Sequence, residues 1–483
     1  MRPDICINLL ECYKFRTIDG KRYAFDEDGK MLYGWINDNH DRVDDDSWAD
    51  DGVYYLGSWD DGAMKTGWQK ITVQDNYDDD EEKDFWFNFK SNGKRRQWTS
   101  SDDGTVKEVK INGKKYGFDE RGVMVYEWTI TTAADTASTS TWKYFNNPED
   151  GARVTKGWFK VVAPEEDNDN TFRDYGENVS FAIGDANDET DRWYYADGDG
   201  NLAVGEIKKI KGKYYGFRPE GKKGGAMLNG LVFMQTDGKG NITNVWDDSV
   251  DSDELDDIID EKAYSDDWGT EVYSDPMTSL YYFGNDEDND GALKTGMVSV
   301  SLDGDSYNFQ FSKSGGVEGK GKGVTGIDDE KYIYKYGLKI KADSDDKYQV
   351  VKVDAPEAGK GTDIGTNGVS VIKIDSKDLR GEASDLGQND DGDNVAAVVK
   401  GGEAWDASYY LVNTSGSISK KKSAAKDGDD WYFYVNKENQ IVMYTNSKNL
   451  DWDKDHTDLK PENLGYDLDK WENWRSNAFD PFN

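Results

Sequence analysis

The sequence predicts an all-β protein, a β-solenoid of stacked β-hairpin repeats that ends in a divergent β-rich region. Composition, internal repetition and turn chemistry each point to it. Aromatic residues make up 13% of the chain, although hydrophobic residues make up only 36%. Such a chain builds many small cores around a few rings rather than one large layered core. Disordered acidic chains are poor in aromatic residues, so a net charge of -38 does not indicate disorder here.

The internal repetition is visible at one fixed offset. Tyr-Ala-Phe-Asp at residues 23–26 returns as Tyr-Gly-Phe-Asp at residues 116–119, which lie 93 positions later (116 − 23). A third copy, Gly-Lys-Tyr-Tyr-Gly-Phe, begins at Gly212. Such self-similarity is typical of repeat architectures. The same offset relates four further pairs: Gly29 and Gly122, Met31 and Met124, Tyr33 and Tyr126, Trp35 and Trp128.

A second motif alternates with the first and explains the hairpins. Residues 54–68 read Tyr-Tyr, then Gly-Ala-Met-Lys-Thr-Gly-Trp, and residues 281–297 repeat them with Met297 in place of Trp68. The aromatic run favours a strand, and the Asp/Asn-rich stretch that ends in Gly favours a turn. One hairpin alone is marginal in water, so successive hairpins are expected to stack.

We expect three segments: an irregular lead-in over residues 1–19, the repeat array over 20–310, and a divergent β-rich region with a terminal hairpin and cap over 311–483. Acidic spacers at Asp75–Asp84, Pro164–Thr171 and Asp247–Asp267 are predicted to be surface loops. The one helical candidate is Asp253–Ala263, in which apolar residues recur at helical spacing.

The charge balance excludes several partners. With 97 acidic and 59 basic residues, the chain would repel nucleic acid and anionic membrane surfaces. Insertion into a membrane is not expected either, because no apolar run is long enough to span one. The two cysteines, Cys6 and Cys12, are too few for a disulfide framework or a zinc cluster. They form either a local bridge or two unpaired thiols.

No catalytic motif is visible, so we expect a protein that is not an enzyme. The two histidines, His40 and His456, stand far apart, which argues against hydrolases that depend on histidine or zinc. A glycosidase needs only two carboxylates, and composition alone does not exclude it. These carboxylates are more simply interpreted as solvated turn residues.

One segment could hold a metal ion, and otherwise no cofactor is expected. Asp286-x-Asp288-x-Asp290-Gly291 resembles the start of a calcium loop, since hard cations prefer clustered oxygens beside a turn. The acidic residue that would complete the loop is replaced by Met297. Incidental calcium binding and a plain surface turn therefore both remain open.

The N-terminal residues do not form a visible signal peptide. Asp4 and Glu11 interrupt their apolar run, and no small-residue cleavage site follows. A repeat begins at Gly20, so we expect the natural N-terminus to lie further upstream. The location expected for the whole protein is secreted or on the cell surface.

The motif at residues 54–68 resembles the choline-binding or cell-wall-binding repeat of Gram-positive surface proteins. Related repeats occur in glucan-binding domains of glucosyltransferases and in the C-terminal repeats of bacterial toxins. The resemblance covers about residues 20–310, with a weaker echo at 405–445. It implies non-catalytic attachment to a cell-wall polymer, either choline-bearing teichoic acid or a glycan. The alternatives are a structural spacer or adhesin stalk, or the binding part of a cell-wall hydrolase whose catalytic domain is absent.

In the choline-binding branch of that family, rings from adjacent hairpins form a cage for a quaternary ammonium through cation–π attraction. Trp68 and Trp158 are the preferred candidates, because each follows a Gly at a hairpin corner. Each ring could instead belong to a core. The Trp-Tyr-Tyr opening of the family is intact only at Trp193, and acidic insertions separate the units. The residues that the resemblance implies are Trp35, Tyr55, Met64, Trp68, Trp128, Trp142, Tyr144, Trp158, Trp193 and Tyr195.

Overall fold

The structure, a computed structural model, consists mainly of β-strands. Three short helices lie among the described residues: α1 (Trp48–Asp51), α3 (Ser252–Ile259) and α5 (Glu271–Ser274). The all-β prediction is therefore confirmed. In the part of the chain that the structure describes, no helix is both long and apolar enough to cross a membrane. The described residues are 15–75, 81–97, 106–130, 142–162, 191–219, 224–237, 239–264, 271–313, 319–354, 369–376, 379, 383–385, 396–399, 407–420, 425–426, 431–435 and 438–445.

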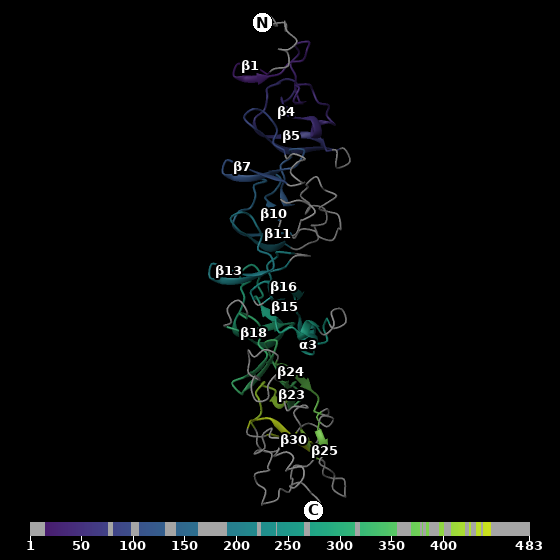
Figure 1. Cartoon of the computed structure of the whole chain (residues 1–483), viewed down its shortest axis with the longest axis vertical. Coiled ribbons are helices and arrows are strands. Elements are labelled where there is room, and N and C mark those ends of the chain that lie inside the picture. The colour runs from purple at the N-terminus through teal and green to yellow at the C-terminus, as the bar shows by residue number, and fades with distance from the viewer. Residues whose placement is uncertain are drawn as a thin grey trace, which may run out of the picture. The chain divides into compact units, whose positions relative to one another are not determined.

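The chain divides into two compact units, whose residues can be found in Figure 1 from the colour bar. Unit 1 comprises residues 1–206 and 217–227, and unit 2 comprises residues 207–216 and 228–483. The boundaries predicted at residues 19 and 310 stay predictions. Cys6, Cys12, His456 and the spacer Pro164–Thr171 lie outside the described residues.

In the part of unit 1 that the structure describes, six two-stranded hairpins follow one another in sequence order. We number them 1 to 6. Five of them have strands of at most six residues, and hairpin 3 is the longest, with nine residues in each strand. The hairpins are β1 (Arg16–Ile18) with β2 (Lys21–Tyr23), β3 (Trp35–Ile36) with β4 (Tyr54–Tyr55), β5 (Gly67–Asp75) with β6 (Glu81–Phe89), β7 (Lys107–Ile111) with β8 (Lys114–Phe118), β9 (Glu127–Ile130) with β10 (Trp142–Phe145), and β11 (Gly157–Val162) with β12 (Asp191–Ala196).

A recurring five-residue turn explains the Asp- and Asn-rich segments. In each copy the N–H of the first residue donates to the carbonyl of the fifth, and the fourth residue has a positive φ. Glycine adopts that conformation without steric cost and fills the fourth position in six of the seven described copies, while His40 (φ 70) fills it in one. In every copy except the one at Lys90, a side-chain oxygen of the first residue also accepts the N–H of the fifth. The seven copies begin at Asp26, Asn37, Lys90, Asp119, Asp197, Asp237 and Asn413.

One repeated hydrogen bond joins consecutive hairpins at seven junctions of the described chain. A residue that follows a hairpin donates its N–H to a carbonyl in or beside a strand of the hairpin before it, at 2.8 Å in every described copy. This bond ties the hairpins together in sequence order, as expected for units that cannot bury their own faces alone. The unit 1 copies are Met64 to Arg22, Arg95 to Val53, Met124 to Trp86, Arg153 to Lys115, and Met227 to Trp193; those of unit 2 are Leu293 to Tyr214 and Gly323 to Leu280.

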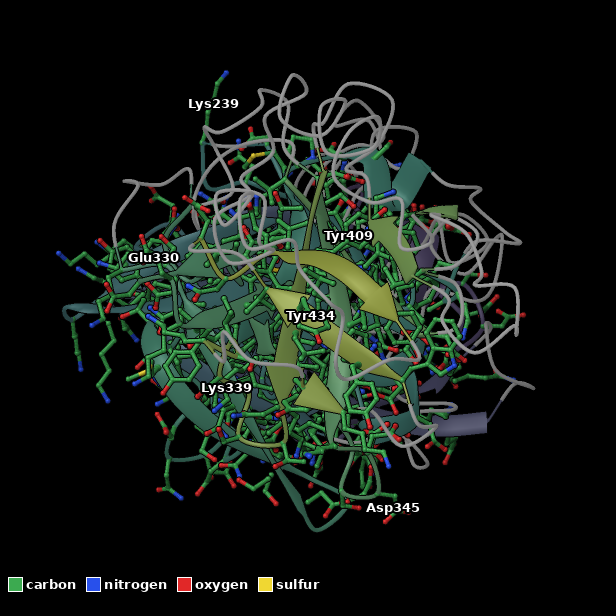
Figure 2. The ribbon with its side chains drawn as sticks, turned by 90° about the horizontal axis from the view of Figure 1, so that it is seen from below. Lys239, Glu330, Lys339, Asp345, Tyr409 and Tyr434 are labelled. Carbon is green, nitrogen blue, oxygen red and sulfur yellow. The ribbon has the colours of Figure 1, made fainter. Side chains whose placement is uncertain are left out.

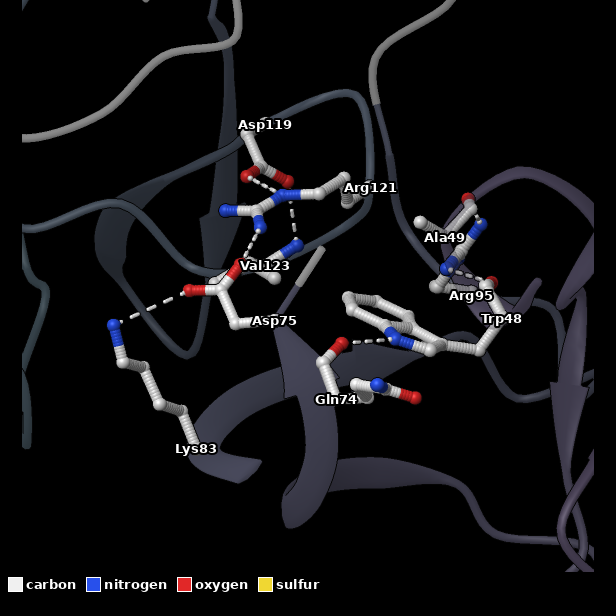
Figure 3. Close-up of polar contacts among 9 residues, drawn as sticks. All are labelled: Trp48, Ala49, Gln74, Asp75, Lys83, Arg95, Asp119, Arg121 and Val123. Carbon is white, nitrogen blue, oxygen red and sulfur yellow. Dashed lines mark hydrogen bonds and ion pairs between the residues drawn. The ribbon is translucent and has the colours of Figure 1, made fainter. Parts of the chain in front are cut away.

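A buried polar network joins hairpins 3 and 4 (Figure 3). The Arg121 guanidinium lies 2.9 Å from the Asp75 carboxylate and 3.0 Å from that of Asp119, and the N–H of Val123 donates to Asp119. Burial raises the pKa of Asp119, and the adjacent Arg121 opposes that shift. The prediction of a loop over Asp75–Asp84 is wrong at both ends, because Asp75 is the buried last residue of β5 and β6 begins at Glu81.

Arg95 occupies a similar buried place in unit 1, beside Trp48 (Figure 3). Its guanidinium donates to the backbone carbonyls of Trp48 at 3.0 Å and Ala49 at 2.8 Å. Burial lowers the pKa of Arg95 to about 10. The Trp48 indole in turn donates to the carbonyl of Gln74 at 2.8 Å, so helix α1 is held against hairpin 3.

Three further hairpins lie among the described residues, and larger sheets follow. Hairpins 7, 8 and 9 are β13 (Glu206–Ile210) with β14 (Lys213–Phe217), β15 (Leu231–Thr236) with β17 (Thr278–Tyr282), and β18 (Gly296–Leu302) with β19 (Asp305–Phe311). Hairpin 7 belongs to unit 2 except for its end residues Glu206 and Phe217, which belong to unit 1. Hairpin 9 is part of a sheet of order β18-β19-β22-β21-β20, sheets of orders β24-β23-β27 and β25-β26-β30-β29-β28 follow, and β16 flanks β15. Their strands are β16 (Ile242–Asp247), β20 (Gly326–Asp328), β21 (Tyr332–Lys335), β22 (Leu338–Lys339), β23 (Tyr348–Asp354), β24 (Ser370–Ile374), β25 (Ala383–Asp385), β26 (Ala396–Val399), β27 (Ala407–Asn413), β28 (Ala425–Lys426), β29 (Tyr432–Val435) and β30 (Ile441–Thr445).

The spacer predicted as a loop over Asp247–Asp267 contains part of the unit 2 core. Leu255, Ile258 and Ile259 of α3 are buried, and Asp251 caps the helix by accepting the N–H of Glu254. The loop prediction is therefore wrong here, and the helical candidate is confirmed. In Figure 2, which labels six residues of unit 2, Tyr409 lies among the strands and Lys239 projects from the edge of the view.

Candidate functional site: two ring clusters

Trp68 stands at the corner where hairpin 3 begins. Gly67 precedes it with a φ of 72°, a conformation that favours glycine, so the chain turns sharply into β5. The ring is half-buried, and its residue pairs with Asn88 of β6. Trp158 has the corresponding place at the start of β11, where it follows Gly157 and pairs with Tyr195 of β12.

Three rings gather around Trp68, and we call the four together cluster A: Trp68, Trp86, Tyr116 and Phe118. Trp68 stacks on Phe118 with centroids 5.7 Å apart and planes at 29°. Trp86 stands almost perpendicular to Trp68 at 6.4 Å and 82°, and Tyr116 lies 4.8 Å away at 63°. Phe118 is buried, and the other three rings are half-buried.

Trp158, Trp193, Tyr195 and Phe217 form a second set, cluster B, which also lies within unit 1. Trp158 stacks on Phe217 at 5.6 Å and 29°, and Trp193 stands perpendicular to it at 6.3 Å and 86°. These values repeat those of cluster A. Tyr195 completes cluster B at 5.2 Å from Trp158. Phe217 is buried and forms the base of the set.

Charged side chains border both clusters. Lys70 pairs with Trp86 across hairpin 3, and Lys160 pairs with Trp193 across hairpin 6, with its Nζ 6.0 Å from that ring. Cluster A also has a carboxylate at its edge. Glu149 accepts hydrogen bonds from the Lys70 ammonium at 2.8 Å and from the Trp86 indole at 3.0 Å.

Three of the predicted ligand-binding rings lie in cores. Trp35, Trp128 and Trp142 are 5%, 0% and 2% exposed. Trp35 packs against Phe87 at 5.2 Å, and Trp128 packs against Tyr194 at 4.8 Å. These rings stabilise their hairpins by burial of apolar surface.

The other predicted residues are half-buried; some pack beside the cores and the others belong to clusters A and B. Tyr55 lies 5.2 Å from the Trp35 ring, and Tyr144 lies 5.1 Å from the Trp128 ring. Burial raises the pKa of Tyr144 to about 12. Met64 packs beside the buried residues Ala24, Ile36, Tyr54 and Leu56. Trp68 and Trp158 join clusters A and B instead, and Trp193 and Tyr195 join cluster B.

Four rings of the clusters were not among the sequence-predicted site residues: Trp86, Tyr116, Phe118 and Phe217. Trp86 is part of a Phe-Trp-Phe run, and strand alternation places it on the face of the hairpin opposite to that of its two neighbours. The remaining three belong to the repeated Tyr-x-Phe motif, which occurs at hairpins 1, 4 and 7. Trp59, at 74% exposure in the segment between β4 and β5, was also missed.

The predicted calcium loop is held by its own side chains. The Asp286 carboxylate accepts the N–H groups of Asp288 and Asn289, and Asp290 binds the Lys294 ammonium. Among the described residues, no three His, Cys, Asp or Glu side chains gather in a way that could hold a metal ion. Calcium binding stays a prediction.

No protein-family model and no curated protein sequence matches this chain. Solved structures that resemble it include choline binding protein F from Streptococcus pneumoniae, with 18% identity, TM-score 0.37 and coverage of 89% of this chain and 98% of that one. CbpJ from the same organism has 17% identity and a TM-score of 0.38, with coverage of 89% of this chain and 99% of that one. The modular autolysin LytC gives 16% and 0.30, with 70% of this chain and 50% of that chain covered. Choline-binding proteins, which the repeats resemble, are thus among the similar structures.

Proposed function

We propose that this chain is a non-catalytic attachment module that binds a cell-wall polymer on the cell surface. The chemical groups that it would recognise are the quaternary ammonium groups of choline-bearing teichoic acid or the sugar faces of a glycan. The hairpins would stack as a β-solenoid, and residues 20–310 would form the binding array. No nucleic acid or membrane insertion is part of this function.

The observation that carries the proposal is the repetition of one ring arrangement in clusters A and B. A buried Phe lies under a half-buried Trp, and a second Trp stands perpendicular to the first. The perpendicular rings offer faces in different directions, which suits a compact cation, and each well-placed ring contributes about 0.5–2 kcal/mol to cation binding. A flat Trp face also stacks on a sugar.

Each cluster alone would bind weakly, so a polymer must engage both. Two sites on one chain raise the effective concentration of the second ligand group once the first is bound. The proposal therefore requires that loss of both clusters reduces binding more than the loss of either one suggests.

Retention on purified choline-bearing cell walls tests the proposal. Trp68→Ala and Trp158→Ala should each weaken retention in a folded protein, the double variant should lose it disproportionately, and free choline should compete. Trp59→Ala is the control for removal of an exposed Trp outside the clusters. Full retention by a folded double variant would overturn the proposal.

The alternative is a spacer or adhesin stalk, and the buried Trp35, Trp128 and Trp142 favour it because their rings build the hairpins rather than contact a ligand. It predicts that Trp68→Ala lowers the free energy of unfolding and leaves wall retention unchanged in every folded variant.

A further inference from the structure

We propose that Glu149 is a positioning residue for cluster A, which fixes the Trp86 ring relative to the rings of the next hairpin. This inference rests on the proposed function of the clusters. Glu149 lies in the turn that follows hairpin 5, whereas Trp86 lies on β6 of hairpin 3. The contact thus joins residues 63 positions apart, and hairpins 4 and 5 lie between them in the sequence.

Both carboxylate oxygens of Glu149 accept hydrogen bonds from residues of hairpin 3. Oε2 accepts the Trp86 indole N–H at 3.0 Å, and Oε1 accepts the Lys70 ammonium at 2.8 Å. Trp86 and Lys70 are a cross-strand pair, so one carboxylate restrains both partners. An indole N–H has one direction, and a bond to it therefore limits rotation of the ring.

The turn that carries Glu149 is itself fixed to hairpin 4, which supplies Tyr116 and Phe118. Ala152 forms a bridge with Tyr116, and the N–H of Arg153 donates to the carbonyl of Lys115 at 2.8 Å. Within the turn, the Asn147 side chain accepts the N–H groups of Glu149 and Asp150, both at 3.0 Å. Glu149 therefore couples the half of cluster A on hairpin 3 to the half on hairpin 4.

An exposed ion pair adds little to stability, and the Glu149 side chain is 64% exposed. Its consequence should be found in ring placement, since a binding site loses affinity when a ring moves by a fraction of an ångström. The hydrogen bonds from Lys70 and Trp86 hold the pKa of Glu149 below its usual range, so the carboxylate is charged at neutral pH.

The first experiment observes the ring directly. The full chain is labelled with 5-fluorotryptophan, and Trp86→Phe assigns the Trp86 fluorine resonance. Glu149→Ala should shift and broaden that resonance and leave the Trp158 and Trp193 resonances of cluster B unchanged. Glu149→Gln should restore most of the wild-type position, because the amide oxygen can still accept the indole N–H. An unchanged Trp86 resonance in Glu149→Ala would overturn the inference.

The second experiment measures binding with choline chloride in a Trp158→Ala background, where cluster A is the cluster left intact. Glu149→Ala should weaken affinity by about threefold to tenfold, the size expected for loss of one charge-assisted hydrogen bond at an exposed site. Glu149→Gln should recover part of it, and the urea midpoint should barely change. Asp28→Ala, which removes an exposed ion pair with Lys30 away from the clusters, is the matched control.

The two proposals fail in different ways. If Trp68→Ala also leaves choline affinity unchanged, the function proposed for cluster A is wrong. If Trp68→Ala weakens binding and Glu149→Ala does not, the function stands and the positioning role of Glu149 is wrong. Equal loss in Glu149→Ala and Glu149→Gln would also contradict positioning, because it would point to the charge alone.

Discussion

Hairpins 3 and 9 begin alike and differ in what they present. Each starts with a Gly in the left-handed region, Gly67 in one and Gly296 in the other. The next residue is the half-buried Trp68 in hairpin 3 and Met297, at 76% exposure, in hairpin 9. Hairpin 3 pairs Lys70 with Trp86, whereas hairpin 9 pairs Ser299 with Asn308 at the same register.

This difference separates the residues that form the hairpin from the rings that line a candidate site. The glycine corner and the strand register form the hairpin whether or not rings are present. The rings of cluster A are additional, because hairpin 9 forms without rings at the positions of Trp68 and Trp86. Rings that build a core and rings that border a site should therefore respond very differently to substitution.

The largest effect is expected at a core ring. Trp128→Ala removes a fully buried side chain that packs against Trp142 and Tyr194, and it should cost about 3–5 kcal/mol of unfolding free energy. Urea unfolding followed by circular dichroism measures this loss. Trp128→Phe keeps the protein folded if the larger truncation does not. Trp68→Ala should lose less than half as much, and equal losses would erase the distinction between the two kinds of ring.

A comparable loss is expected in the polar network of unit 1. Arg121→Met leaves the Asp75 and Asp119 carboxylates without the guanidinium that lies between them, and breaking a buried ion pair costs about 3–5 kcal/mol. The variant should regain part of its stability at low pH, because Asp119 takes up a proton when its cation is lost and burial already raises its pKa. Thermal melts at pH 7 and pH 4.5 measure this, with Lys30→Met as an exposed control. A variant less stable relative to wild type at the lower pH would contradict the explanation.

A smaller effect is expected when the corner residue of hairpin 9 is made like that of hairpin 3. Met297→Trp restores the ring at the corner of hairpin 9 but not the aromatic partner, since Asn308 stands at the register of Trp86. We expect a change in stability of about 0.5 kcal/mol or less and no gain in choline binding in the Trp68→Ala, Trp158→Ala background. Calorimetric titration checks this. Binding restored by one ring would mean that the perpendicular partner is dispensable.

The smallest effect concerns the acidic turn at Asp286. Its carboxylates already bind Asn289 and Lys294, so a chelator should leave the melting temperature unchanged. Calcium added to the chelated protein should not raise it either. A rise that Asp288→Ala abolishes would establish the calcium site instead.

The sequence predicted the local features and missed the distant contacts. Glycine corners and aromatic runs are enough to place β5 and β11, because both depend on neighbouring residues. Trp35 and Trp68 follow the same Gly-Trp pattern, yet only Trp35 is enclosed by a core, to which Phe87 and Phe89 of the next hairpin contribute. No local pattern contains that information. The Glu149–Trp86 contact is likewise invisible in the sequence, since it depends on how hairpins 3 and 5 meet.

The hydrogen bond that recurs between consecutive hairpins also sets an order of events during synthesis. The carbonyl of Arg22 receives its partner only when Met64 has been made, 42 positions later (64 − 22). For Trp86 and Met124 the delay is 38 positions (124 − 86). At each of these junctions, a growing chain in unit 1 exposes an unfinished strand until the next hairpin has been made. A pause within such an interval would hold an open β-edge in solution, where it could pair with another chain.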